Sequence, residues 1–164
     1  MRLPASDRFL IGIVVGSVLL IIIAVMIVLN RATPAYRTGN EPADVVFNYL
    51  LAVQQGDYER AYSFLSPTLP GYPRNVQEMR SQLPPANFSN EDVSFTVISS
   101  RIDGDWATVD VRETTVYRSG IFGSNTSTAV FTVGLQRRDG IWQLVSNTNW
   151  RTWSWCWEQE GGCR

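Results

Sequence analysis

The hydrophobic positions of the chain follow three successive patterns, and each pattern predicts a different kind of structure. The first is a continuous apolar stretch that begins with Phe9, ends with Leu29 and contains no charged residue. The second repeats apolar residues every three or four positions, which is typical of helices that bury one face. The third alternates apolar and polar residues, as strands of a half-buried sheet do.

Residues 9–29 are expected to form a single transmembrane helix, preceded by an N-terminal flank at residues 1–8. At about 1.5 Å per residue the stretch spans roughly 30 Å, the thickness of a bilayer's hydrocarbon core. A cleaved signal peptide is the alternative, but its apolar region has only roughly 7–15 residues. The membrane is therefore the first expected partner. Arginines lie on both sides of the stretch, so the positive-inside rule leaves the orientation open.

Helical periodicity begins after a polar linker, residues 30–40. Asn40 is the expected cap of the first helix, and Gly56 is expected to end it. Asp57 is expected to cap a second helix, and a shorter third helix is expected over residues 76–83. The buried sides of the first two helices are expected to contain Val46, Tyr49, Leu50, Val53, Tyr58, Ala61, Tyr62 and Leu65.

The second half of the chain predicts an antiparallel sheet of about four strands. Asp103-Gly104 and Asp139-Gly140 are turn signals between alternating runs. Helices followed by a meander of strands indicate an α+β fold, with the helices packed on one face of the sheet. The expected strands cover residues 93–98, 107–112 with a continuation as far as residue 117, 129–135 and 141–145, and residues 119–125 are an expected loop.

Composition removes several classes of chemistry. The chain has no His and no Lys, so its 14 basic residues are all Arg, and its net charge is −1. The commonest general base, the commonest metal ligand and the Schiff-base amine are therefore missing. We expect no catalytic constellation, no metal site, no cofactor and no nucleic-acid partner, and a binding role is favoured over an enzymatic one.

The two cysteines bear on location. Cys156 and Cys163 are close in sequence, and Gly161 and Gly162 between them allow the chain to turn back. A disulfide is sterically feasible there and would indicate a compartment outside the cytosol. Two unpaired thiols are the alternative. We expect the pair to be oxidised and the C-terminal domain to be extracytoplasmic.

Tryptophans are concentrated in the tail, residues 150–164. In an extended segment Trp153, Trp155 and Trp157 would share one face, with Cys156 on the other. Packing against the domain is the plainest interpretation. A partner-binding surface that includes Arg151 is the second, and contact with envelope sugars or with the membrane interface is the third.

Residues 52–67 (AVQQGDYERAYSFLSP) and 133–145 (VGLQRRDGIWQLV) resemble the paired helices and the last hairpin of the nuclear transport factor two-like (NTF2-like) superfamily. The likeness covers roughly residues 41–149 and is closest to small membrane-anchored envelope proteins of bacteria, most without assigned function. It implies a cystatin-like, cone-shaped domain over residues 41–149, with a cavity between helices and curved sheet. The residues expected to line an apolar pocket there are Tyr49, Val111, Phe131 and Leu135.

Asp110, Arg112 and Glu113 are the charged residues of a predicted strand, Asp110 and Arg112 on one face and Glu113 on the other. They are interpreted as a solvated strand face, with a polar group at the cavity mouth as the alternative. Three functions follow from the sequence. The first is a membrane-tethered extracytoplasmic domain that binds a protein or envelope component. The second is a small-molecule binder that uses the cone pocket, and the third is a small acid/base enzyme of the same fold.

Overall fold

The computed structural model describes residues 5–29, 34–84, 91–119 and 123–163. The chain divides into two units, Met1–Ala35 and Tyr36–Arg164. The first unit contains α1 (Ala5–Leu29), whose side chains are described over residues 11–27. Except for Ser17, these side chains are apolar or absent, and they are largely exposed around the helix, from Ile11 to Ile27. Within the described residues, no helix reaches the combined length and hydropathy that crossing a membrane requires.

Three helices open the second unit. The N-cap of α2 (Pro42–Gln55) is Glu41 rather than the expected Asn40, and Pro42 is the first helical residue, where its fixed φ suits a helix start. Its end is the expected one, since Gly56 adopts φ 71°, a left-handed conformation that suits glycine.

The next two helices are short and capped by side chains. Asp57 caps α3 (Tyr58–Ser63) by accepting a hydrogen bond of 3.2 Å from the Arg60 N–H. Asn75 caps α4 (Val76–Gln82) in the same way, through the Glu78 N–H at 2.9 Å. Both caps satisfy a backbone donor that a helix start leaves without an intrahelical partner.

Part of the predicted linker lies against these helices. The Tyr36 hydroxyl donates to an Asp57 carboxylate oxygen at 3.2 Å. The backbone N–H and C=O of Arg37 both bond the Asn48 side chain, at 2.7 Å and 2.9 Å. Residues 30–33 lie outside the described residues.

The four strands form one antiparallel sheet in the order β1-β2-β3-β4. They are β1 (Glu91–Asp103), β2 (Trp106–Ser119), β3 (Gly123–Arg138) and β4 (Ile141–Asn147). β3 starts six residues before the expected 129, and β2 runs on to Ser119. The expected loop at 119–125 was therefore too long. Residues 123–130 are exposed on both faces, so they carry no apolar alternation that would reveal a strand.

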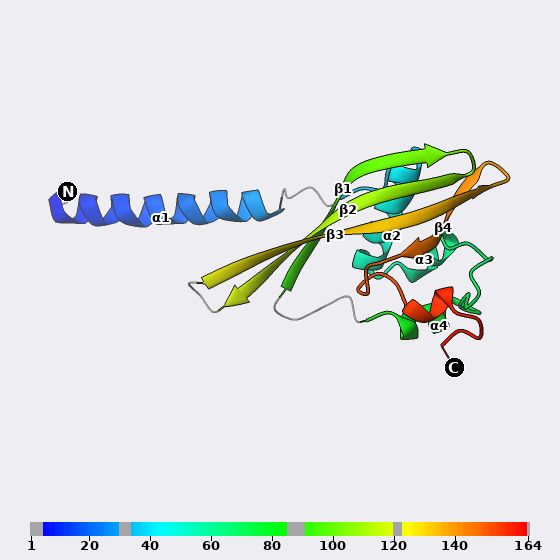
Figure 1. Cartoon of the computed structure of the whole chain (residues 1–164). Coiled ribbons are helices and arrows are strands. Elements are labelled where there is room, and N and C mark those ends of the chain that lie inside the picture. The colour runs from blue at the N-terminus through cyan, green and yellow to red at the C-terminus, as the bar shows by residue number, and fades with distance from the viewer. Residues whose placement is uncertain (1–4, 30–33, 85–90, 120–122, 164) are drawn as a thin grey trace. The chain divides into compact units, whose positions relative to one another are not determined.

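Helices and sheet enclose one hydrophobic core. α2 contacts β1, β2 and β4, and the sheet side chains that face it alternate along each strand, as Val109 and Val111 do. Figure 1 shows α2, α3 and α4 gathered on one side of the sheet, with β2 and β3 running on as a hairpin past the end of β4. The α+β architecture of helices on a four-stranded antiparallel sheet is therefore confirmed.

Candidate functional site

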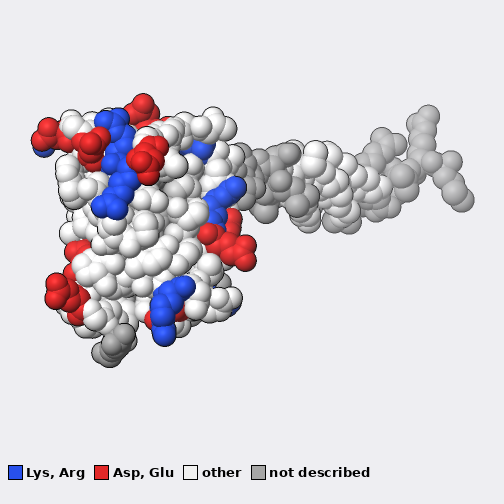
Figure 2. All heavy atoms as spheres, turned by 90° about the vertical axis from the view of Figure 1, so that its right-hand side faces the viewer, with Lys and Arg blue, Asp and Glu red and all other residues white. Residues whose placement is uncertain are grey.

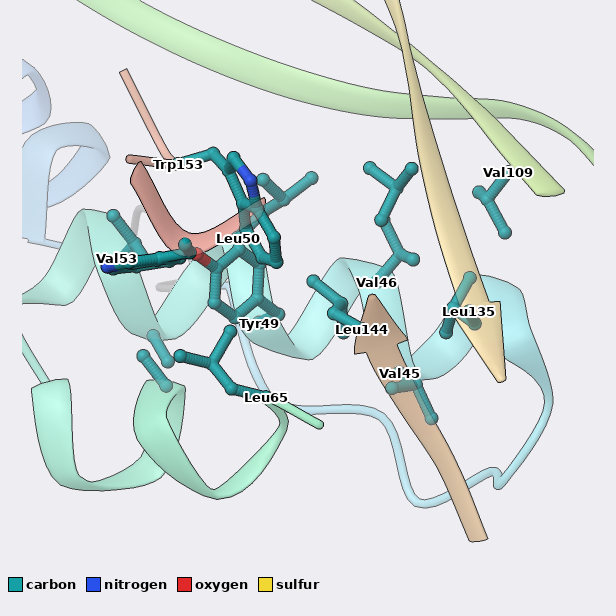
Figure 3. Packing of buried hydrophobic residues seen from close by; sticks show 14 of the residues in the cluster. Val45, Val46, Tyr49, Leu50, Val53, Leu65, Val109, Leu135, Leu144 and Trp153 are labelled. Carbon is teal, nitrogen blue, oxygen red and sulfur yellow. The ribbon is translucent and has the colours of Figure 1, made fainter. Parts of the chain in front are cut away.

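The expected tail begins two residues earlier in the structure, and this segment, residues 148–163 and called the tail below, folds back over the open end of the core. Trp153 and Trp157 are 3% and 0% exposed, and their rings pack edge to face with centroids 4.8 Å apart. Trp153 also meets the ring of Tyr49 from α2 at 6.5 Å, a contact seen from close by in Figure 3. Two of the tail tryptophans are thus core residues of the domain.

Hydrogen bonds fix Trp157 to the segment around α4. Its indole N–H donates to the Gln82 side-chain oxygen at 2.6 Å, and its carbonyl accepts from the Gly71 N–H at 2.9 Å. A side chain at Gly71 would collide with the Cys156 carbonyl, so glycine permits this close approach of two backbones. The tail and the α4 region therefore form one surface with fixed geometry.

A buried polar cluster joins the tail to the inner face of β2. The Glu113 carboxylate is reached by the Arg151 Nε and the Thr115 hydroxyl, at 3.0 Å and 3.1 Å from Oε1. Its other oxygen, Oε2, accepts a hydrogen bond from the Asn149 amide. The Glu113 and Arg151 side chains are only 10% and 12% exposed. Both oxygens of Glu113 are engaged within the protein, so the carboxylate holds the tail in place.

The Tyr49 hydroxyl extends this network. It donates to the backbone carbonyl of Thr152, whose own hydroxyl accepts from the Asn147 amide at 3.1 Å. Burial raises the pKa of Tyr49 above its usual value of about 10. Tyr49 therefore keeps its proton at physiological pH and acts as a donor that ties α2 to the tail.

Trp155 is placed differently from its neighbours. The segment Trp155–Glu158 forms a 3-10 helix, so the expectation that Trp153, Trp155 and Trp157 share one face of an extended chain was wrong. Trp155 points outward and is 71% exposed, whereas Cys156 and Trp157, which follow it, are both buried. Cys156 and Cys163 lie at disulfide distance, with Cα atoms 5.1 Å apart.

A hollow of about 750 Å³ lies beside Trp155, between α4 and the tail. α4 and the turn before it contribute Arg74, Gln77, Glu78 and Ser81, while the tail contributes Trp155 and the cysteine pair. The hollow thus combines one exposed indole with amide, hydroxyl and guanidinium groups. Polar residues outnumber apolar ones in this lining, so the hollow offers many hydrogen-bonding groups and one large apolar contact, the indole of Trp155.

The charges around the hollow are balanced. The Arg74 guanidinium bonds the Glu78 carboxylate, with 3.0 Å between Nε and Oε2. This hydrogen bond is the main cause that holds the pKa of Glu78 below its usual range. On the face drawn in Figure 2, basic and acidic side chains are likewise interleaved. The balance favours an uncharged or mixed-charge ligand over a polyanion.

The four residues expected to line an apolar pocket lie in the core cluster. Tyr49, Val111 and Leu135 are fully buried, and Phe131 is 6% exposed and packs edge to face on Phe95 at 5.8 Å. The described hollows lie elsewhere, along α3, α4 and the tail. These four side chains therefore act as packing in this structure.

The charged strand residues separate as the alternation predicts. Asp110 and Arg112 lie on the outer face, where Asp110 accepts hydrogen bonds from Ser99 and Thr132 at 2.7 Å and 2.9 Å. These two hydrogen bonds lower the pKa of Asp110, and the bond from Ser99 has the larger effect. Glu113 lies on the inner face, as described above.

Sequence reasoning missed two parts of this arrangement. Glu113 follows Val109 and Val111 at the same two-residue spacing on one strand face, and a carboxylate in that apolar register signals a buried partner. Arg151 was considered only as part of a partner surface. The contribution of Gln77 and Ser81 to the hollow carries no sequence signal, because both read as ordinary polar positions of a surface helix.

The fold and site define a small α+β domain whose open end is closed by its own Trp-rich tail. No protein-family model matches the chain, and no curated protein matches it. Similar solved structures include a SEC-C motif containing protein from Rhodopseudomonas palustris, 15% identical over 68% of this chain and 80% of that one, with a TM-score of 0.48.

Two further solved structures are also similar to the chain. One is an NTF2-like protein of unknown function from Shewanella oneidensis, 14% identical over 63% of this chain and 90% of that one, with a TM-score of 0.44. The other is the beta subunit of benzoate 1,2-dioxygenase from Burkholderia mallei, 13% identical over 68% and 90%, with a TM-score of 0.41. The structural neighbours thus include an NTF2-like protein. All three similarities are distant, and none of them assigns a function to the chain.

Proposed function

We propose that the chain is a membrane-tethered extracytoplasmic domain that binds a component of the cell envelope, without catalysis, in the hollow between α4 and the tail. The observation that carries the proposal is Trp155, a large apolar side chain that is 71% exposed on a segment fixed by its neighbours. A solvent-exposed indole held rigidly costs little conformational entropy when a ligand covers it.

The tether rests on α1. Apart from Ser17, the exposed side chains described for α1 are apolar on all sides, which suits a lipid environment and not an amphipathic surface helix. The location rests on Cys156 and Cys163, because a cysteine pair at disulfide distance persists outside the reducing cytosol. Both features are consistent with an anchor followed by a domain on the outer face.

A sugar polymer is the ligand class that the lining fits best. The face of an indole packs on the C–H surface of a sugar ring, while Gln77, Ser81 and Arg74 offer donors and acceptors to its hydroxyls. The hollow is open at the surface, so an extended chain can lie across it. A protein partner would use the same Trp155 and Arg74 as anchors, since Trp and Arg are enriched at binding hot spots.

The small-molecule alternative has less support, because its four expected lining residues are packed in the core. The enzymatic alternative has one specific observation in its favour, a buried carboxylate at Glu113. Both oxygens of that carboxylate are occupied by Arg151, Thr115 and Asn149, which favours a structural role.

Co-sedimentation with insoluble envelope polysaccharide tests the proposal, with Trp155→Ala as the test variant. Loss of a hot-spot tryptophan is expected to weaken binding by more than about tenfold. Trp150→Ala is the matched control, since Trp150 is also in the tail and 62% exposed but does not line the hollow. Equal sedimentation of both variants, or none for the wild type, would reject the sugar-binding site.

A further inference from the structure

The edge of β3 that lies beyond β4 has the properties of an unpartnered sheet edge. β3 pairs with β2 along its whole length, but its pairing with β4 begins only at Val133. At Thr132 the N–H and C=O both point away from β2, since they bond the Thr148 hydroxyl and the Thr148 N–H at 3.2 Å each. Backbone direction alternates along a strand, so residues 124, 126, 128 and 130 point outward in the same way.

No strand among the described residues pairs with these four outward positions. Their side chains are also exposed, and Val130 is 60% exposed. Figure 1 shows this stretch as the start of β3, at the free end of the hairpin. A row of backbone donors and acceptors without a strand beside it is a template for pairing with another chain.

The opposite edge of the sheet, formed by β1, is protected from pairing with another chain, unlike the free stretch of β3. β1 carries charged residues such as Asp92 and Arg101, and a bulge interrupts its register between Val97 and Ser99. The Gln54 side chain also covers the carbonyl of Val93 with a hydrogen bond of 2.8 Å. Charges, bulges and side-chain covers are the devices that keep an edge from pairing. The free stretch of β3, residues 124–130 (SNTSTAV), has no charged residue and no proline.

We propose that this stretch of β3 pairs antiparallel with the same stretch of a second copy of the chain, giving a continuous sheet across a two-fold axis. The axis falls at Ser127, the midpoint of residues 124–130, because Thr132 is already bonded to Thr148. In this register Thr126 lies opposite the partner's Thr128, and Ser124 lies opposite the partner's Val130. All outward backbone groups of the stretch are then paired with one another.

Two features of the chain favour a second copy over an unrelated strand. The stretch is self-complementary, since pairing brings Thr126 opposite Thr128 and Ser127 opposite its own copy at the centre and sets no like charges face to face. Independently, Gly12 and Gly16 stand four residues apart on α1, with open space where a Cβ would be. Glycines at this spacing allow two membrane helices to approach closely. This second feature rests on the proposed tether, whereas the strand pairing does not.

Disulfide trapping tests the pairing on the full-length chain in detergent or in its membrane. In the Ser127→Cys variant the two new cysteines face each other across the axis at a non-hydrogen-bonded position, with Cα atoms about 4.5 Å apart. Mild oxidation is expected to give a covalent dimer. Asn125→Cys is the matched control on the same strand face, since its two copies lie about 13 Å apart along the strands. We expect at least about tenfold less dimer from it, because such a span cannot be bridged.

A charge pair tests the register independently. Thr126→Lys with Thr128→Lys places like charges opposite each other at both positions, and we expect the trapped dimer of Ser127→Cys to be lost. Thr126→Lys with Thr128→Glu places opposite charges there and is expected to retain it. Equal trapping at residues 125 and 127, or a Ser127→Cys chain that stays monomeric, would overturn the proposal. Trapping of a different protein at Ser127→Cys would also overturn it and would identify an unrelated strand as the occupant. None of these outcomes depends on whether Trp155 binds sugar.

Discussion

At the scale of single residues, the polar group that matters most to the domain is Glu113. It lies on the inner face of β2, with a cation from the tail at 3.0 Å and an amide from the same tail on its other oxygen. An ion pair this far from solvent contributes little net stability compared with apolar packing, but breaking it leaves a buried charge without compensation. The pair therefore determines where the tail sits.

Replacing Arg151 by Met is expected to destabilise the domain by about 3–5 kcal/mol, because Glu113 stays buried without its cation. Chemical denaturation measures this loss as a lower midpoint. The double variant Glu113→Gln/Arg151→Met removes the stranded charge and is expected to recover most of the stability. A single variant as stable as the wild type would show that Glu113 is not held by this pair.

Asp110 gives a prediction about pH on the outer sheet face. Its folded pKa is lowered by hydrogen bonds from Ser99 and Thr132, so its contribution to stability is present above the unfolded value of about 3.9. The contribution is lost as pH falls through the lower, folded value. The melting temperature of Asp110→Asn should thus lie below that of the wild type at pH 6, and the gap should close below about pH 4. A gap that is the same at both pH values would contradict this cause.

At the scale of elements, the tail is the part that the sequence predicted least well. The hydrophobic periods predicted the helices and the strand order, because amphipathic elements with one buried face carry their period in the chain. The dipeptide signals located both turns, the first of them one residue early, since that turn is Gly104-Asp105. The 3-10 helix at Trp155–Glu158 has no such signal, since four residues are too few to show a period.

The predicted hairpin of β2 and β3 was shorter than the observed one for a related reason. Beyond Val130 toward its tip, β3 has no buried face, so a pattern read from burial stops before the strand does. The positions expected to form an apolar pocket were found on the correct inner face, but a pattern of inward residues cannot distinguish a lined cavity from a packed core.

Substituting the tail tryptophans one at a time separates packing from binding. Trp157→Ala removes a fully buried indole and its bond to Gln82, and we expect it to cost about 3–5 kcal/mol of stability. Trp155→Ala changes a surface side chain and should cost within about 0.5 kcal/mol. Thermal denaturation followed by circular dichroism compares the two. Similar losses for both would mean that Trp155 is also part of the core.

At the scale of the whole molecule, the proposal gives each of the two units its own role. It assigns attachment to α1 and binding to the unit Tyr36–Arg164, which has a core, a closed end and an outward-facing tryptophan.

The tether predicts how the chain behaves in cells. The full-length chain should remain in the membrane fraction after an alkaline carbonate wash and be released by detergent, because an apolar helix leaves lipid only for another apolar phase. Protease added to intact spheroplasts should digest the domain if it is extracytoplasmic. A domain that is protected there, or a chain that is released by carbonate, would contradict the proposed location or the anchor, respectively.

The central claim is that Trp155 is the ligand contact while Trp153 and Trp157 are packing. Fluorine NMR of the chain labelled with 5-fluorotryptophan tests it directly, with the six resonances assigned by single Trp→Phe variants. Addition of soluble envelope oligosaccharide is expected to shift or broaden the Trp155 resonance and to leave Trp150 and Trp157 in place. A Trp155 resonance that does not respond, or a response confined to the buried Trp153 and Trp157, would contradict the account and point to a ligand inside the core.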